Sequence, residues 1–354
     1  MMNIFRGCWR CGGTGRAVLI ALAVALALAA SGCSGSEGTE SADSGSAGGI
    51  EKATVILDWS PNTNHTGMYV AKSLGYYEEA GLDVDIVQPA EGAAEQLVAV
   101  GQGDFGVSYQ ERVNYALTQD DPLPIRSIAT IIQHNTSGFV SLPESGIETP
   151  ADWAGKTYGG WGTPAEENVL RFIAGKYGIA YEDIDIVNLG EDDVITALKG
   201  DMDFAWVFEA SDLINFQKQK VAYDYISCPS IDETLDYYTP ILIANTKLIA
   251  DNPEKVKAFT EATARGYEYA IEHPDEASAI LLKEVPELDE YVVVEGQRYL
   301  SPRYAKDAPR WGWQEEIVWE RYADLMYDNG ELPRRLDLQA AFTNEFLPEA
   351  AEAR

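Results

Sequence analysis

From Ala53 onward, short apolar runs alternate with longer segments whose apolar residues recur at helical spacing. Short apolar runs bounded by turn residues are typical of buried strands, whereas apolar residues at every third or fourth position are typical of helices. Strands that alternate with helices favour layers built on mostly parallel sheets. The pattern therefore predicts an α/β protein with strands at residues 54–57, 84–87, 105–108, 125–132, 156–158, 184–187, 204–207 and 240–244.

The helical segments complete this pattern. Between the strands, helices are expected at residues 67–80, 93–99, 164–175 and 194–199. Asn252-Pro253-Glu254 is a strong helix start, because Asn caps the helix, Pro fits its first position and an acidic residue favours its first turn. We therefore expect the region after residue 252 to be largely helical and to pack back on the first part of the fold.

Two stretches of the chain repeat each other. Residues 97–105 and 197–204 both contain a helix that ends at glycine, a turn with Asp and a strand that begins with Phe. About 300 folded residues also suit two hydrophobic cores better than one. The sequence predicts two lobes of similar construction, with residues 53–138 and 245–354 in lobe I and residues 139–244 in lobe II.

The first 32 residues have the features of a bacterial export signal. A basic start precedes a hydrophobic run over residues 17–30, which is too short to span a bilayer comfortably. Ala30-Ser31-Gly32-Cys33 resembles a lipobox, so Cys33 is the expected lipidation site, and a plain signal peptide with an incidental cysteine is the alternative. Residues 33–52 are rich in Gly, Ser and acidic residues and are expected to form a flexible tether. The predicted location is extracytoplasmic, with a lipid anchor to the cell membrane.

Charge and cysteine content exclude several classes of partner and of functional site. The formal net charge of −31 makes nucleic acid and anionic lipid surfaces improbable partners. Outside the export signal and the lipidation site, Cys228 is the one cysteine, so an intramolecular disulfide is not expected. The three histidines, His65, His134 and His273, lack metal-ligand spacing. The sequence contains no Gly-x-Ser-x-Gly elbow and predicts no catalytic residues, no metal and no cofactor.

Aromatic and hydrogen-bonding residues follow several predicted strands, at the ends where open α/β sheets bind ligands. The segment at residues 58–67 is the most informative of these. Turns favour Pro and Asn because of the backbone conformations that these residues adopt, but they do not need an indole and an imidazole. Flat aromatic surface beside amide, imidazole and carboxylate groups suits capture of a small planar ring. The candidate ligand-binding residues are Trp59, Asn62, Asn64, His65, Tyr109, Gln110, Trp161, Glu167, Trp206, Glu209, Tyr237 and Tyr238.

Several candidates also have a structural interpretation. Trp59 and Trp206 could be core residues, and His65 could be a structural hydrogen-bonding residue. Tyr109 and Gln110 could cap the following helix. The sequence leaves these alternatives open, and the convergence of such residues at several strand ends is what indicates a binding site.

The glycine-rich turn before residue 164 has its own alternatives. Gly159-Gly160-Trp161-Gly162 would let a ligand approach the backbone closely, but it lacks the lysine and spacing of a phosphate-binding loop. Glu166 and Glu167 open the next predicted helix, where the helix dipole favours carboxylates in any protein. Binding of a nucleoside triphosphate is therefore not expected.

Several of these phrases together resemble the NMT1/THI5-like substrate-binding proteins. Residues 57–65, 108–110 and 236–238 carry the resemblance, and residues 69–71, 75–77, 252–256 and 342–346 add to it. The resemblance covers about residues 53 to 348. It implies the fold of type II periplasmic binding proteins, in which two α/β lobes joined by two crossings hold a ligand in the cleft between them.

Within this family, the chain resembles the formylaminopyrimidine-binding lipoproteins of the ThiY group. The resemblance implies a monomer that captures a thiamin-precursor pyrimidine, either N-formyl-4-amino-5-aminomethyl-2-methylpyrimidine or hydroxymethylpyrimidine, and delivers it to an ABC permease. Its one contact with the membrane would be the lipid anchor. A carboxylate facing the amidine-like edge of the ring, from Glu167 or Glu209, would add a charge-assisted hydrogen bond.

Three other functions remain as alternatives. Relatives bind another flat heterocycle of the riboflavin type, or a small sulfonate, for which hydroxyls and helix N-terminal amides are expected in place of stacked aromatic rings. The pyrimidine synthases of the same family carry a Cys-rich loop and a cofactor-bearing Lys. Here residues 236–240 read Asp-Tyr-Tyr-Thr-Pro where that Cys cluster would fall, and Ser108 stands near the expected Lys. The chain is therefore expected not to be an enzyme.

Overall fold

The computed structural model describes residues 49–89, 93–189 and 193–349. The predicted signal peptide, Cys33 and most of the predicted tether lie outside the described residues. The predicted end of that tether at residue 52 is wrong, because the first strand already begins at Glu51. Among the described helices, none combines the length and the hydrophobicity that crossing a membrane requires.

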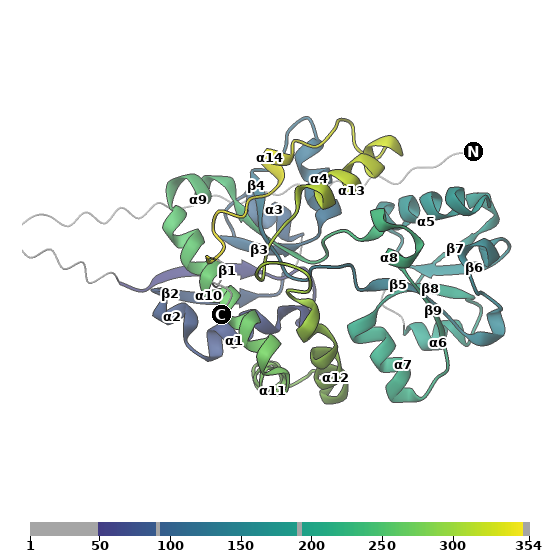
Figure 1. Cartoon of the computed structure of the whole chain (residues 1–354), viewed down its shortest axis with the longest axis horizontal. Coiled ribbons are helices and arrows are strands. Elements are labelled where there is room, and N and C mark those ends of the chain that lie inside the picture. The colour runs from purple at the N-terminus through teal and green to yellow at the C-terminus, as the bar shows by residue number, and fades with distance from the viewer. Residues whose placement is uncertain (1–48, 90–92, 190–192, 350–354) are drawn as a thin grey trace, which may run out of the picture. The chain divides into compact units, whose positions relative to one another are not determined.

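The described strands form two five-stranded sheets (Figure 1). The first sheet has the order β2-β1-β3-β10-β4, in which β10 runs antiparallel to β3 and β4 and the other pairs are parallel. Its strands are β1 (Glu51–Ile56), β2 (Leu82–Val87), β3 (Phe105–Ser108), β4 (Ile125–Thr130) and β10 (Ile241–Asn245). The second sheet has the order β7-β6-β8-β5-β9, with β5 antiparallel to both of its neighbours. Its strands are β5 (Ser137–Ser141), β6 (Thr157–Gly160), β7 (Asp185–Asn188), β8 (Phe204–Phe208) and β9 (Asp224–Ser227).

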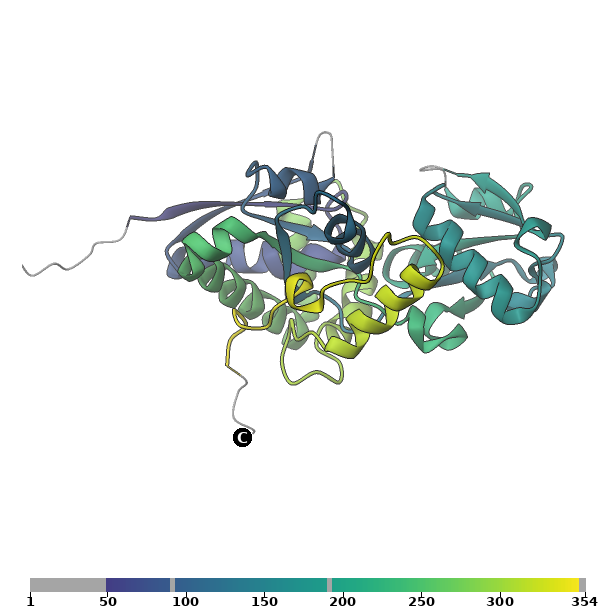
Figure 2. The same cartoon turned by 90° about the horizontal axis from the view of Figure 1, so that it is seen from above.

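Helices flank both sheets (Figure 2). The α-helices are α1 (Thr66–Ser73), α2 (Tyr76–Glu79), α3 (Ala94–Ala99), α4 (Gln110–Thr118), α5 (Pro164–Tyr177), α6 (Val194–Leu198), α7 (Ile214–Gln219), α8 (Cys228–Ile231), α9 (Thr246–Asp251), α10 (Pro253–Glu272), α11 (Pro274–Glu284), α12 (Glu290–Leu300), α13 (Glu316–Asp328) and α14 (Leu338–Ala341). Four short turns matter for the site or the crossings: the 3-10 helices η1 (Thr63–His65), η6 (Glu233–Leu235) and η7 (Ser301–Arg303), and the π-helix η5 (Glu209–Leu213).

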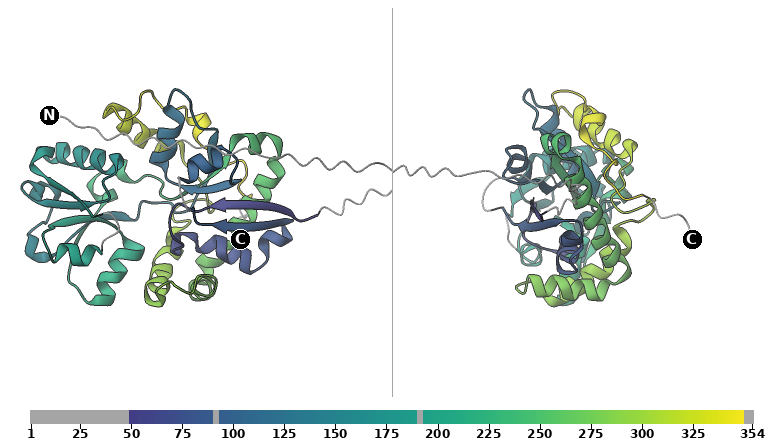
Figure 3. Two further views of the ribbon diagram at one scale, coloured as in Figure 1. Left: turned by 180° about the vertical axis from the view of Figure 1, so that it is seen from behind. Right: turned by 90° about the vertical axis from the view of Figure 1, so that its left-hand side faces the viewer.

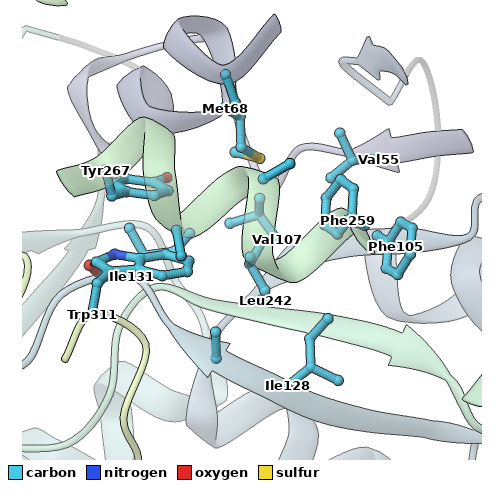
Figure 4. Packing of buried hydrophobic residues seen from close by; sticks show 14 of the residues in the cluster. Val55, Met68, Phe105, Val107, Ile128, Ile131, Leu242, Phe259, Tyr267 and Trp311 are labelled. Atoms are coloured by element: carbon cyan, nitrogen blue, oxygen red, sulfur yellow. The ribbon is translucent and has the colours of Figure 1, made fainter. Parts of the chain in front are cut away.

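Alternation along the strands explains why each sheet is covered on both faces. In β10, Leu242 and Ala244 join the core beneath α1 and α10, whereas Ile241 and Ile243 join the core beneath α3, α4 and α13. Successive side chains of a strand point to opposite faces, so a continuous apolar run buries both. Figure 4 shows part of the first core, in which the rings of Phe105 and Phe259 stack with centroids 3.8 Å apart.

The chain leaves the first lobe and later returns to it (Figure 3). The first crossing lies between β4 and β5, and the second lies between β9 and β10. The two crossings are hydrogen-bonded to each other, because Asp236 accepts from the Asn135 amide at 2.8 Å and pairs with His134 Nδ1 at 2.7 Å. The segments that connect the two lobes are therefore held to each other by side-chain contacts.

The repeat seen in the sequence has a structural counterpart. In the first lobe, the Asp104 carboxylate accepts a hydrogen bond from the Thr54 amide at 2.9 Å. In the second lobe, Asp203 accepts from the Thr157 amide at 2.8 Å. In each case the Asp lies in the turn before one strand and binds the backbone of the neighbouring strand, at Thr54 within β1 and at Thr157, the first residue of β6. The prediction of two similarly built lobes is thus supported by matching contacts.

Several predicted boundaries are wrong. Strands β5 and β9 were not predicted, and β10 belongs to the first sheet although the predicted second lobe extended to residue 244. Because β5 begins at Ser137, the predicted lobe boundary after residue 138 also falls inside a strand. The helix predicted at residues 67–80 is two helices, separated at Gly75, whose φ of 77° only glycine adopts without strain.

A glycine pair allows α1 and α10 to cross closely. A Cβ at Gly266 would lie 2.0 Å from the Gly67 carbonyl oxygen, and a Cβ at Gly67 would lie 2.3 Å from the Tyr267 ring. We expect Gly266→Ala to lower the free energy of unfolding by about 3 kcal/mol, since backbone cannot move aside as a side chain can. Urea denaturation measures this, and Gly175→Ala, where nothing lies within 4 Å of the added Cβ, is the matched control. Equal stability of the two variants would contradict this packing.

Candidate functional site

A buried carboxylate lies at the carboxyl end of β1. Asp58 Oδ1 pairs with His65 Nε2 at 2.7 Å, and its Oδ2 accepts a hydrogen bond from the Tyr109 hydroxyl at 2.5 Å. Tyr109 follows β3, so the ends of two neighbouring parallel strands meet here as predicted. Asp58 itself was not among the predicted ligand-binding residues, although it opens the phrase that drew attention to this turn.

The hydrogen-bond pattern fixes the state of this group. The Asn62 amide donates to His65 Nδ1 at 3.1 Å, so the imidazole proton lies on Nε2 and points at Asp58. Burial alone would raise the pKa of Asp58, but the adjacent imidazole and the Tyr109 hydroxyl favour its charged form and hold the pKa below its usual value. Asp58 is therefore an anion whose two oxygens are oriented by two donors.

Asn62 and Asn64 build the turn that carries His65. The Asn62 side chain accepts from the Asn64 amide at 2.9 Å and caps η1. The Asn64 carbonyl accepts from the Tyr267 hydroxyl at 2.6 Å, which ties the turn to α10. These contacts give both asparagines a structural role in the turn, which is the backbone reason that Asn is favoured there.

Trp59 is the exposed aromatic residue of this group. Its side chain is 54% exposed, directly after the buried Asp58. A core position, the alternative for Trp59, is therefore wrong. An exposed indole beside an oriented carboxylate gives a flat ring a surface on which to stack.

Three predicted residues near this turn serve the fold. Gln110 is fully buried, and its side chain donates to carbonyls of α13 and accepts from the Tyr238 amide at 2.9 Å. The Tyr238 hydroxyl accepts from the Glu315 amide at 2.8 Å. Tyr237 stacks on Tyr322 with ring centroids 3.9 Å apart. Gln110, Tyr237 and Tyr238 thus join α4, the second crossing and α13 by contacts within the protein.

The second lobe contributes an aromatic cluster at the ends of β6 and β8. Trp161 is 38% exposed, and its ring stacks on Phe208 at a centroid distance of 5.9 Å. Trp206 is only 6% exposed and lies beneath it, 6.1 Å from the Trp161 ring. Of the two tryptophans, Trp161 therefore offers a face to a ligand, and Trp206 supports it from the core.

Two glutamates open α5, and the buried one is Glu166, which was not among the predicted ligand-binding residues. Glu166 is 4% exposed and accepts from the Trp161 amide at 2.9 Å, the Thr163 amide at 2.9 Å and the Tyr158 hydroxyl at 2.7 Å. Glu167 lies on the exposed face of α5 and pairs with Arg171 at 2.7 Å. Glu167 is thus a surface ion pair, while Glu166 holds the turn that carries Trp161.

Glu209 follows β8 and opens the π-helix η5. Its Oε1 accepts from the Tyr225 hydroxyl of β9 at 2.9 Å, and its Oε2 accepts from the Tyr299 hydroxyl of α12. Glu209 is half-buried, and each of its carboxylate oxygens is oriented by a tyrosine hydroxyl. Tyr225 and Tyr299 were not predicted, because they lie on separate elements far along the chain.

The two carboxylates are linked through α12. A Cβ at Gly296 of α12 would lie 2.4 Å from the Ala210 oxygen in η5 and 3.5 Å from Thr63 Oγ1 in η1. Asp58 is bound by His65 of η1, and Glu209 is the first residue of η5. The strand ends of the two lobes therefore meet at α12, with one carboxylate from each lobe near the junction.

Glu111 of α4 is a further carboxylate close enough to Tyr109 to influence it electrostatically, and it was not among the predicted residues. Its Oε2 is out of solvent and has no hydrogen-bond partner among the described residues. Burial, together with the nearby carboxylates of Glu95 and Glu331, raises the pKa of Glu111 to about 7. A carboxyl group with this pKa is partly protonated near neutral pH.

The raised pKa of Glu111 predicts a pH-dependent effect on stability. A carboxyl whose folded pKa lies above its unfolded value stabilises the fold at low pH and loses that contribution as the pH rises through the folded pKa. We therefore expect Glu111→Gln to raise the free energy of unfolding by on the order of 2 kcal/mol at pH 8 and to change it little at pH 5. Thermal unfolding at both pH values measures this, with Glu167→Gln as control. An equal effect at both pH values would contradict the assignment.

The residues that could bind a metal or act as a nucleophile are few in the part of the chain that the structure describes. They contain no group of three or more His, Cys, Asp or Glu side chains arranged to hold a metal ion. Cys228 is fully buried, and burial raises the pKa of its thiol to about 12. A thiol in that state is a poor nucleophile.

Known proteins resemble the chain in sequence. A formylaminopyrimidine-binding protein of Halalkalibacterium halodurans is 29% identical over 83% of this chain and 90% of that protein. A 4-amino-5-hydroxymethyl-2-methylpyrimidine phosphate synthase of Legionella pneumophila is 25% identical over 84% of this chain and 93% of that enzyme.

The solved structures confirm the predicted fold. The alkanesulfonate-binding protein SsuA of Xanthomonas axonopodis matches with a TM-score of 0.63 at 14% identity, over 83% of this chain and 99% of that protein. At this identity the likeness concerns the fold, which is that of type II periplasmic binding proteins. A family model described as NMT1/THI5 like matches residues 62–277, more than half of the chain. The chain belongs to the NMT1/THI5-like family.

Proposed function

We propose that this protein is the extracytoplasmic ligand-binding component of an ABC importer and that it captures a thiamin-precursor pyrimidine. The observation that carries the proposal is that the strand ends of both lobes carry an exposed indole and a carboxylate oriented by hydrogen bonds. In the first lobe these are Trp59 and Asp58, and in the second they are Trp161 and Glu209. The formylaminopyrimidine-binding relative supports the same ligand class.

The chemistry of an aminopyrimidine matches these groups. Its flat ring would stack on Trp59 or Trp161, and each aromatic pair contributes roughly 0.5–1.5 kcal/mol beyond the burial of area. Its amino and formamide N–H groups are hydrogen-bond donors. Asp58 and Glu209 accept hydrogen bonds, and bonds to a charged acceptor are stronger than neutral ones. Of the two glutamates considered, we propose that Glu209 accepts the hydrogen bond from the amino group, because Glu167 faces solvent beside Arg171.

The same groups disfavour a sulfonate. A sulfonate is an anion with acceptor oxygens only, and carboxylates at the strand ends would repel it. The turn at the start of α5 has amides of the kind that bind anions, but Glu166 already occupies the amides of Trp161 and Thr163. A ligand that brings donors and a flat face suits these strand ends better than an anion does.

The residues also favour binding over synthesis. Ser108, near the position expected for the synthases' Lys, is fully buried and donates a hydrogen bond to Glu95. Asp236, where their Cys cluster would fall, holds the two crossings together. We therefore expect the protein to bind and release a pyrimidine without forming a product.

The proposed mechanism is capture without chemistry. One lobe binds the ring and the other closes over it through the two crossings, as in hinge-type domain closure. The closed form would then be recognised by an ABC permease. We further propose that the protein acts as a monomer, held outside the cell membrane by lipid on Cys33.

A calorimetric titration tests the ligand. The protein is unfolded and refolded to remove bound ligand, and formylaminopyrimidine, hydroxymethylpyrimidine, thiamin, riboflavin and taurine are injected separately. We expect one-site binding of a pyrimidine at micromolar or better and much weaker binding of the other compounds. If riboflavin or taurine releases heat and neither pyrimidine does, the proposed ligand is wrong. The proposed role in transport would still stand.

A further inference from the structure

Helix α12 contacts both lobes. On the side of the first lobe it packs against α11, η1 and η7, and on the side of the second it packs against η5 and α7. Its N-cap residue, Asp289, also forms an ion pair with Lys218 at the end of α7. The helix therefore spans the boundary between the lobes at a place other than the two crossings.

The contact between α12 and η5 is close. Gly296 brings the helix backbone against the Ala210 carbonyl, where any larger residue would collide, since its Cβ would lie 2.4 Å from that oxygen. Ala210 is buried and packs in the core of the first lobe although it lies in η5. This fit fixes the position of Glu209, the residue before Ala210, relative to α12.

Tyr299 extends from α12 to the Glu209 carboxylate. Its hydroxyl donates to Glu209 Oε2, while Tyr225 of the second lobe donates to Oε1. The Arg303 guanidinium lies over the Tyr299 ring, 3.6 Å from its centroid, and its Nη1 donates to the Tyr299 carbonyl at 2.6 Å. The phenol is thus held in place from its own side of the boundary.

We propose that Tyr299 is a positioning residue that orients the Glu209 carboxylate across the lobe boundary and so couples contact with the ligand to lobe closure. This inference rests on the proposed function for its ligand. Each carboxylate oxygen can accept more than one hydrogen bond. A ligand N–H can therefore bind Glu209 while Tyr299 and Tyr225 remain bound, and the phenols fix where that N–H must lie.

The first arm of the test needs no ligand. Spin labels on the exposed positions Val100→Cys and Ile186→Cys report the distance between the lobes by pulsed electron resonance. Cys8, Cys11 and Cys33 are replaced by serine, and the buried Cys228 is retained. We expect Tyr299→Phe to broaden the distance distribution toward longer separations. Tyr291→Phe, on the same helix but 43% exposed, is the matched control and should leave the distribution unchanged.

The second arm measures formylaminopyrimidine kinetics by stopped-flow tryptophan fluorescence. A residue that acts in the closed complex slows dissociation, so Tyr299→Phe should raise the dissociation rate about tenfold and leave the association rate within twofold. Tyr291→Phe should match the parent protein in both rates. A residue with only a structural role would lower the thermal midpoint without this separation of the two rates.

The two arms separate failure of the inference from failure of the proposed function. If the parent protein does not bind formylaminopyrimidine, the proposed ligand is wrong, and the ligand-free distances still decide whether Tyr299 holds the lobes. If the parent protein binds and Tyr299→Phe matches Tyr291→Phe in distances and in rates, the positioning role of Tyr299 is overturned.

Discussion

Trp59→Ala is expected to weaken pyrimidine binding by roughly 2–3 kcal/mol, or about 30- to 150-fold, while leaving the fold intact. The indole is 54% exposed, so its loss removes little packing from the protein itself. In the complex, the same surface would be buried against the ring. Calorimetry with formylaminopyrimidine measures the loss, and thermal unfolding checks the fold.

Two further variants sharpen this result. Trp59→Phe keeps an aromatic face and should retain most of the affinity. Ile317→Ala removes an apolar side chain that is likewise exposed, at 58%, on α13 and should bind as the parent protein does. Wild-type affinity in Trp59→Ala would place the ligand elsewhere. Equal losses in the Ala and Phe variants would show that stacking is not the contribution of this residue.

Asp58→Asn is expected to lower the free energy of unfolding by about 2–4 kcal/mol and to reduce binding strongly. Two donors point at the carboxylate, the His65 Nε2–H and the Tyr109 hydroxyl. An amide of the same shape offers one acceptor oxygen and an NH2 group, so at best its oxygen accepts from His65 while the Tyr109 hydroxyl turns to accept from the NH2 group, and two charge-assisted hydrogen bonds become neutral ones. The imidazole cannot relieve this by moving its proton, because Nδ1 accepts from the Asn62 amide.

A double-mutant cycle identifies the cause. Tyr109→Phe removes one of the two donors, so Asp58→Asn should cost less in that background than in the parent protein. Additive losses in urea denaturation would mean that the two side chains do not interact as described.

The lowered pKa of Asp58 predicts how the free energy of unfolding depends on pH. A carboxylate whose folded pKa is depressed contributes stability above its unfolded pKa and loses it as the pH falls through the folded value. The unfolded value is about 3.8 and the folded value is lower, so the parent protein should lose this contribution below about pH 4. Asp58→Asn should lack that part of the acid-induced loss.

The sequence predicted the architecture because strand and helix periods are local. It placed Trp59 and Tyr109 correctly at neighbouring strand ends, since parallel strands bring their carboxyl ends together. It missed β5 and β9, because β5 pairs with β8 and β9 pairs with β5, and both pairings join residues that are distant in the chain. It also assigned β10 to the wrong lobe, because the residues of a strand do not indicate which of two sheets the strand joins.

The site was predicted less completely than the fold. Gln110 has the chemistry of a ligand-reading residue, but its partners are carbonyls of α13, more than two hundred residues along the chain. Tyr299 contacts Glu209 only because α12 crosses between the lobes. Asp58 could have been chosen, since it is the first polar residue after β1. For Gln110 and Tyr299, only the tertiary structure reveals the partner.

The most direct test of the central claim is a crystal structure of the protein with formylaminopyrimidine. We expect the ring against Trp59, between the strand ends of the two lobes, with an N–H group on Asp58 or Glu209. The described surface also has a hollow of about 460 Å³ between α3 and α4, lined by Gln96, Tyr115 and Gln119 among others. A ligand found there, with the strand ends unoccupied, would contradict the account.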